Sequence, residues 1–300
     1  MESHVERYDL WPLVGVDGML QLSGSSVEVN TQTKILLNHF LNYTSKTLCT
    51  VTAETGWLKY AIKDNALFNS TLYHWAVLNY NFLPANVQSQ HNLLALKAAA
   101  IRTLASHFQS ATPVAGGDLE TFGNATIATI ACLANANFLH GDVEEAKIHF
   151  QGLKGMIRSR KGVFHLGFQG LAARIVRWTD SCHAQISNMP LSFDEENSSF
   201  SATHSPFFLL DSQGPYDQPS KLAMVDELRS ISKELIANPK HSMAPDCRTA
   251  LGFRLLASDR AVLKHIHGRT GSSILALLAR GALLFSHVAL RGTSRSSRII

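Results

Sequence analysis

Apolar residues recur every three or four positions from Thr31 onward, which is the period of an amphipathic α-helix. Residues 1–30 have no clear period and contain several glycines, so we expect this N-terminal segment to be poorly structured. Prolines and glycines, which end helices, divide the rest of the chain into segments. The pattern predicts roughly nine helices, at residues 31–43, 66–82, 90–108, 119–139, 142–162, 171–186, 220–237, 246–267 and 272–291.

The best-specified helix begins near Asp142, whose side chain we expect to cap it by accepting backbone N–H bonds. Glu144 and Glu145 follow at the positive end of the helix dipole, and basic residues precede Gly162 at the negative end. Between the two ends, large apolar positions step by four, three and four, so we expect one buried face.

No segment shows the alternating pattern typical of strands, so we predict an all-α fold. Its helices are expected to pack as antiparallel pairs in one helical domain with two lobes. Residues 190–219 contain four prolines and several serines, which is typical of a loop or linker. This segment would separate a helical regulatory lobe at 31–189 from a C-terminal helical lobe at 220–291, which a basic tail at 292–300 follows. Segment 90–108, rich in alanine and leucine, is expected to be buried on more than one side.

The composition, 45% hydrophobic and 17% charged residues, excludes a disordered chain. The four cysteines are too far apart for a zinc pair or a dense disulfide framework, and the first residues lack the apolar run of a signal peptide. We therefore expect an intracellular protein. The apolar stretch at 274–290 is short and contains Arg280 near its middle, so no membrane span is predicted.

The charge is unevenly distributed along the chain. Residues 1–150 hold 8 Lys and Arg against 12 Asp and Glu, whereas residues 151–300 hold 19 against 11. A basic half can indicate an anionic partner such as DNA, but the basic residues here are scattered. We expect no sequence-specific DNA binding from this chain alone.

No loop motif of a hydrolase, dinucleotide-binding enzyme or P-loop NTPase occurs in the chain. Of the fourteen histidines, His265 and His267 are the closest pair, but alternate residues on a helix point apart and cannot share a metal. Aspartate pairs of the kind that bind magnesium diphosphate are also missing. We predict no enzymatic activity, no metal and no cofactor.

Residues 146–180 contain a block of characteristic positions: His149, Gly152, Leu153, Met156, Arg160, Gly162, Trp178 and Asp180. This block resembles the fungal-specific transcription factor domain, the regulatory region of fungal zinc binuclear-cluster transcription factors. Looser similarities extend the resemblance over residues 34–291. The chain lacks that family's six-cysteine cluster, and Lys161 stands where the family has the first glycine of an Arg-Gly-Gly motif.

The resemblance implies an α-helical regulatory domain in the nucleus that acts through protein partners, without catalysis. A small-molecule effector stays unassigned. The alternative is a helical scaffold or repeat-like interaction protein with no role in transcription, because the turn at Gly141 and Asp142 resembles one tetratricopeptide helix. Only one copy of that pattern occurs, whereas solenoids need at least three.

The block positions are expected to be structural, and Asp180 allows two predictions. It could form a surface ion pair with Arg177, one helical turn earlier. Alternatively, it could be semi-buried at a helix junction, where it would pair with Arg160 or accept N–H bonds from the turn after Gly162.

Overall fold

The computed structural model describes residues 30–43, 56–80, 83, 88–110, 122–160, 162–193, 221–238, 245–268 and 281–282. The predicted N-terminal segment, the basic tail and most of the predicted linker lie outside the described residues. The helix predicted at 272–291 also lies outside them, except for its two residues 281 and 282.

The described residues form nine α-helices and two short 3₁₀ turns and contain no strand, which confirms the all-α prediction. Among these helices, none has the length and apolar character needed to span a membrane. The helices are α2 (Thr31–Tyr43), α3 (Leu58–Ala61), α4 (Asn65–Leu78), α5 (Gln90–Ser110), α6 (Asn124–His140), α7 (Val143–Ser159), α8 (Leu171–Ser187), α10 (Lys221–Ala237) and α11 (Pro245–Gly268).

Several predicted helix boundaries agree with local capping. The Asn30 side chain accepts a hydrogen bond from the Thr33 N–H at 2.8 Å and so caps α2. The helix expected at 119–139 begins instead at Asn124, after Gly123 in an extended conformation. Helix α3 was missed because four residues are too few to show a helical period.

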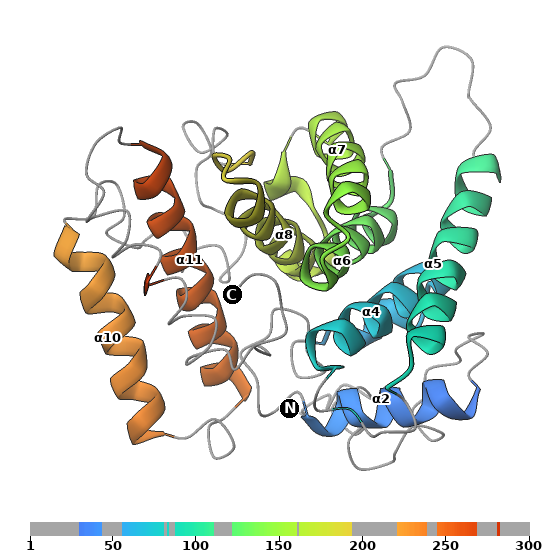
Figure 1. The fold of residues 1–300 in the computed structure, drawn as a ribbon, viewed down its shortest axis with the longest axis horizontal. Coiled ribbons are helices and arrows are strands. Elements are labelled where there is room, and N and C mark those ends of the chain that lie inside the picture. Colours follow the sequence, from blue (N-terminus) through green and yellow to red (C-terminus); the bar gives the residue numbers. More distant parts are fainter. Residues whose placement is uncertain are drawn as a thin grey trace, which may run out of the picture.

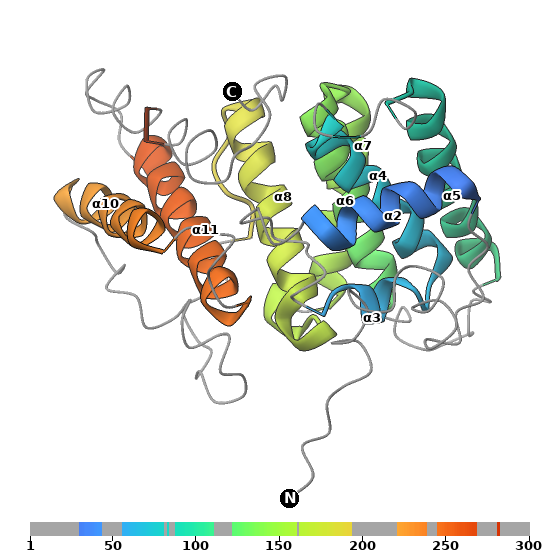
Figure 2. The ribbon, with the colours of Figure 1, turned by 90° about the horizontal axis from the view of Figure 1, so that it is seen from below.

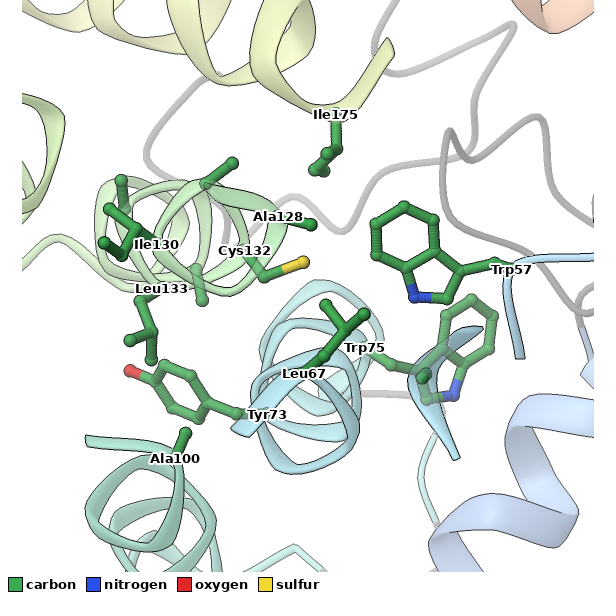
Figure 3. Packing of buried hydrophobic residues seen from close by; sticks show 14 of the residues in the cluster. Trp57, Leu67, Tyr73, Trp75, Ala100, Ala128, Ile130, Cys132, Leu133 and Ile175 are labelled. Atoms are coloured by element: carbon green, nitrogen blue, oxygen red, sulfur yellow. The ribbon is translucent and has the colours of Figure 1, made fainter. Parts of the chain in front are cut away.

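Helix α4 is the centre of the main core. It packs against α2, α3, α5 and α6, and α6 packs in turn against α7 and α8. Figure 3 shows the Tyr73 ring of α4 between Leu133 of α6 and Ala100 of α5, while Cys132 of α6 lies toward Leu67 of α4. The interior is therefore filled by side chains from several helices, with apolar residues dominating.

Helix α5 lies at the edge of this bundle, as both views show (Figures 1 and 2). Its inward residues are buried, but the opposite apolar positions are exposed. The expectation that this segment is buried on more than one side is therefore wrong. Within the described residues the bundle covers α5 along one side, and on the opposite side the Phe108 ring alone meets another ring, that of Phe122. Its alanines gave it high helix propensity, which does not require burial.

Helices α10 and α11 pack on each other through a small separate cluster of Leu228, Ile231, Leu251 and Leu255. Helix α11 also lies beside α8 (Figure 1). There Ala184 of α8 packs with Val262 and Leu263 of α11. These contacts join the C-terminal helices to the main bundle. The predicted antiparallel pairing and the division into two lobes stay predictions.

Candidate functional site

The block residues that belong to helix α7 lie on different faces of the helix. Leu153 and Met156 are buried in the main core, whereas Gly152 lies on the exposed side. A Cβ added at Gly152 would meet nothing within 4 Å, so packing does not require glycine there. The block is thus not one cluster of side chains, and its members have separate roles.

Asp180 of α8 is fully buried at the junction of three segments. Its Oδ1 accepts the Ser192 N–H at 2.8 Å, and its Oδ2 accepts the Phe193 N–H at 3.3 Å. The Arg260 guanidinium of α11 donates to the same Oδ2 at 3.2 Å and to the Arg177 carbonyl at 3.0 Å. One carboxylate thereby fastens the chain after α8 and helix α11 to the bundle. We call the Asp180–Arg260 pair and these two N–H bonds the Asp180 clasp.

Burial raises the pKa of Asp180 above its ordinary value, against the opposing effects of the Arg260 charge and the backbone N–H bonds. The carboxylate is therefore in an environment that disfavours its charge unless every partner is in place. Removing one of these partners should therefore lower the stability of the fold strongly, because a buried charge would be left without compensation.

The two partners expected for Asp180 are wrong. Arg177 is buried and places its guanidinium 4.9 Å from the Phe164 ring centre, so no surface pair forms between Arg177 and Asp180. Arg160 donates instead to Asn124 Oδ1 at 2.8 Å. As the second prediction expected, Asp180 accepts backbone N–H bonds at a helix junction. The N–H groups, however, belong to residues 192 and 193 and not to the turn after Gly162. These residues belong to the predicted linker, whose first four residues are described here, and the Phe193 side chain is 5% exposed.

Arg160 and Gly162 organise the turn between α7 and α8. Asn124 Oδ1 accepts from Arg160 and also from the Gly167 N–H at 3.0 Å, which ties both ends of the turn to the start of α6. Gly162 has φ +109° and ψ 170°, a conformation that side chains with a Cβ do not tolerate well. Glycine is therefore required at position 162, in contrast to position 152.

Trp178 lies in a buried polar seam between α4, α6 and α8. Its ring is edge-on to His74 with centroids 5.1 Å apart. His74 Nε2 lies 3.2 Å from Asn135 Oδ1, and Asn135 Nδ2 donates to Cys182 Sγ at 3.6 Å. Burial lowers the pKa of His74 to about 4, with the Asn135 hydrogen bond opposing, so the imidazole is neutral at pH 7.

The seam contains the residue types of a Cys-His-Asn triad, but in a different order. In such a triad the histidine contacts the thiol and the asparagine orients the histidine. Here Asn135 lies between His74 and Cys182, and all three side chains are at most 1% exposed. The geometry fits a structural hydrogen-bond chain that aligns three helices.

His149 belongs to a third group, where α5 meets the start of α7. Lys97 Nζ lies 2.5 Å from Glu145 Oε2, and Glu145 Oε1 lies 3.3 Å from His149 Nε2. Burial lowers the pKa of His149, against the opposing hydrogen bond and charge of Glu145. Although burial opposes it, the hydrogen bonds and charges of Lys97 and His149 hold the pKa of Glu145 below its usual range.

The expected side-chain cap at Asp142 is wrong. The Asp142 carboxylate makes no capping hydrogen bond and instead lies 3.1 Å from His140 Nδ1 and 3.8 Å from Lys97 Nζ. The Lys97 ammonium and the His140 ring nitrogen compete with the backbone N–H groups for the carboxylate. The helix still begins after Asp142, whose carbonyl accepts the Ala146 N–H at 2.9 Å.

Sequence reasoning missed four of the residues that build these groups. Lys97, Asn135 and His74 are polar residues within otherwise apolar helical faces, and that mismatch was the signal available. Arg260 carried no comparable signal, because it meets Asp180 across 80 residues of chain.

No known protein family, curated protein or solved structure matches the chain. Within the described residues, no three His, Cys, Asp or Glu side chains are placed to hold a metal ion. The side chains of His265 and His267 lie outside that part of the structure.

Proposed function

We propose that this chain is a helical regulatory module of the transcription-regulator type, active in the nucleus through protein partners rather than through catalysis. The observation that carries the proposal is the Asp180 clasp. It lies within the block on which the resemblance rests, and it joins α8, the chain after α8 and α11 through one buried carboxylate.

Charged groups lie at the α8–α11 junction beside the apolar contacts of Ala184 with Val262 and Leu263, and such a mixed junction suits a regulatory element. The guanidinium carbon of Arg174 lies 4.0 Å from the ring centre of Phe253 in α11, and the Asp180–Arg260 pair joins the same two helices. Junctions of this kind are less apolar than a domain core and permit relative movement of the parts they join. A partner that binds either side could therefore change how α10 and α11 sit on α8.

A tethering assay tests the regulatory role. The chain is fused to a sequence-specific DNA-binding domain from another protein, and a reporter gene in fungal cells carries the matching site. We expect the fusion to change reporter output relative to the DNA-binding domain alone. Gly152→Ala, on the exposed side of α7, should keep the change, and Leu153→Asp in the core should abolish it. Unchanged output from the stably expressed fusion would contradict the proposal.

DNA binding by the chain alone supplies a second test. The described helices include no zinc cluster to present a recognition helix, so we expect weak binding without sequence preference. A mobility-shift assay at physiological salt measures it. Tight, sequence-dependent binding would contradict the proposal that the chain acts through protein partners.

The second candidate is an interaction protein with no role in transcription. The apolar residues left exposed along α5 favour it, because such a face suits a binding partner in any cellular process. Partner binding without any reporter response would favour this candidate over the first.

A further inference from the structure

The outer side of α5 carries a continuous apolar stripe. Leu94, Ala98, Ile101, Ala105 and Phe108 follow one another in steps of four, three, four and three, the spacing of a coiled-coil seam. Leu94 is 60%, Ile101 37% and Phe108 41% exposed, Ala105 is exposed and Ala98 half-buried. We call these five residues the α5 outer face.

The α5 outer face is not a random scatter of exposed apolar side chains. Six large apolar residues are exposed in the described part of the chain, and three of them lie on this one stripe. The buried side of the same helix is formed by Leu93, Leu96, Ala100 and Leu104, which are positions distinct from the stripe. Helix α5 therefore has two apolar faces. Among the described residues the bundle covers one of them along its length (Figures 1 and 2), and on the outer face only the Phe108 ring meets another ring, that of Phe122, with centroids 5.8 Å apart.

The shape of the α5 outer face suits another helix. Large residues at 94, 101 and 108 alternate with alanines at 98 and 105, so each alanine leaves a hole between two larger side chains. The two holes are seven residues apart, about 10 Å along the helix. A partner helix with two large apolar residues one heptad apart can place one of them in each hole.

The charges around the α5 outer face indicate which charged residues should flank the apolar residues of a partner helix. Helix α5 contains no Asp or Glu, and Arg102 follows Ile101 beside the stripe. Arg102 is exposed and has no ion-pair partner among the described residues, whereas Lys97 is already paired with Glu145. A second copy of α5 would bring only cationic borders together, so charge favours an acidic partner.

We propose that the α5 outer face binds an acidic amphipathic helix of a partner protein, with two large apolar residues a heptad apart and a carboxylate that pairs with Arg102. This inference rests on the proposed function, for which it names the docking surface and the kind of partner.

The test uses the full chain and a labelled synthetic helix as the probe. The probe is an alanine-based peptide of about 20 residues, long enough to be helical, with two leucines a heptad apart and Glu along one border. A matched peptide carries Lys in place of Glu. We expect fluorescence anisotropy to show saturable binding of the Glu peptide, at least about tenfold tighter than that of the Lys peptide.

Three variants connect binding to this face. Ala105→Leu fills one hole and should weaken binding of the Glu peptide at least about tenfold. Ala237→Leu makes the same change at an exposed alanine of α10, away from α5, and should leave binding unchanged. Arg102→Glu should reverse the preference toward the Lys peptide. Circular dichroism melts of each variant should match the parent, because all three side chains are exposed.

Each remaining outcome overturns the inference. Absence of saturable binding below about 100 µM removes the docking surface. Equal binding by the Ala105→Leu variant places the peptide elsewhere. Concentration-dependent dimerisation that Ala105→Leu abolishes identifies a second copy as the occupant. The reporter assay separates the two proposals: failed peptide binding with an intact reporter response removes the α5 surface alone, and the reverse result removes the transcriptional role alone.

Discussion

Helix α8 makes two junctions of opposite character. Toward α4 and α6 it presents Ile175, Trp178 and Cys182, all at most 1% exposed. They pack in the main apolar core, where Trp178 and Cys182 also border the polar seam of His74 and Asn135. Toward α11 it presents Arg174 and Asp180, which are also buried but meet Phe253 and Arg260 through charge, and the Arg177 carbonyl accepts a hydrogen bond from Arg260. Both junctions exclude water by different means. The first depends on shape and area, and the second on a few groups that must all be present.

The difference determines where single substitutions act most strongly. An apolar junction loses stability roughly in proportion to the volume removed. A buried ion pair contributes little net stability when intact, but leaves an uncompensated charge when one member is removed. The α8–α11 junction is therefore the more sensitive to a change of one functional group.

The largest expected effect comes from removing the Asp180 carboxylate. Asp180→Ala leaves the Arg260 cation buried and two backbone N–H groups without their acceptor, and should lower the free energy of unfolding by about 3 kcal/mol or more. Denaturant unfolding measures it. A loss below about 0.5 kcal/mol would fit a dispensable surface pair and contradict the clasp.

A double-mutant cycle sharpens the same prediction. Replacing both members, by Asp180→Leu with Arg260→Met, removes the charges together and should cost less than the sum of the two single changes. Strictly additive losses would mean that the two residues do not act as a pair.

The apolar junction has its own signature, in the pH dependence of stability. The pKa of His74 falls from 6.5 to about 4 on folding because burial disfavours the charged ring. Below pH 6.5 the unfolded chain therefore binds a proton that the folded chain does not, so stability is full above pH 6.5 and declines toward pH 4. The loss is about 3 kcal/mol at most.

The variant His74→Gln isolates this contribution, because glutamine can still bond Asn135 but does not titrate. Its unfolding free energy, measured by chemical denaturation between pH 7 and pH 4, should fall less steeply than that of the parent. Some slope should stay, because the pKa of His183 is also lowered to about 4, first by burial and then by nearby lysines. Parallel curves would show that His74 is not buried in the neutral form.

The turn that leads into α8 should respond to a smaller change. Gly162→Ala forces a residue with a Cβ into a backbone conformation at φ +109° and should cost about 1–3 kcal/mol. Thermal melts are sufficient to detect it. An unchanged melting temperature would mean that the turn adopts another conformation in solution.

The smallest expected effect has the opposite sign. Gly152→Ala on the exposed side of α7 should stabilise the protein by about 0.5–1 kcal/mol, because alanine has the higher helix propensity and its Cβ meets open space. This variant touches neither junction of α8 and so supplies a baseline for both. A loss of stability would mean that something packs on this face in solution.

Local patterns predicted most of the helices because local chemistry decides them. Asn30 caps α2, and α7 ends before Gly162, as the sequence indicates. The Asp142 side chain departed from its expected role because His140 and Lys97, brought close by the turn and by α5, hold its carboxylate. The sequence shows that the segment of α5 is rich in apolar residues on more than one side. Whether other helices cover the second apolar face depends on the whole fold.

The candidate site could be predicted only in part. Burial of Asp180 was one of two open alternatives, whereas its partner Arg260 depends on how α11 docks. Contacts between segments so distant in the chain are set by packing and leave no local pattern. The polar seam at His74 and Asn135 escaped notice for the same reason, since the two residues lie 61 positions apart.

Hydrogen exchange in the Arg260→Met variant tests most directly whether the Asp180 clasp holds the C-terminal helices on the bundle. We predict faster amide exchange in α10, α11 and residues 191–193, with protection of α4 and α6 unchanged, because the apolar junction of α8 stays intact. Peptide-resolved mass spectrometry separates these regions. Exchange that rises equally throughout the chain, or that does not rise in α11, would contradict the account.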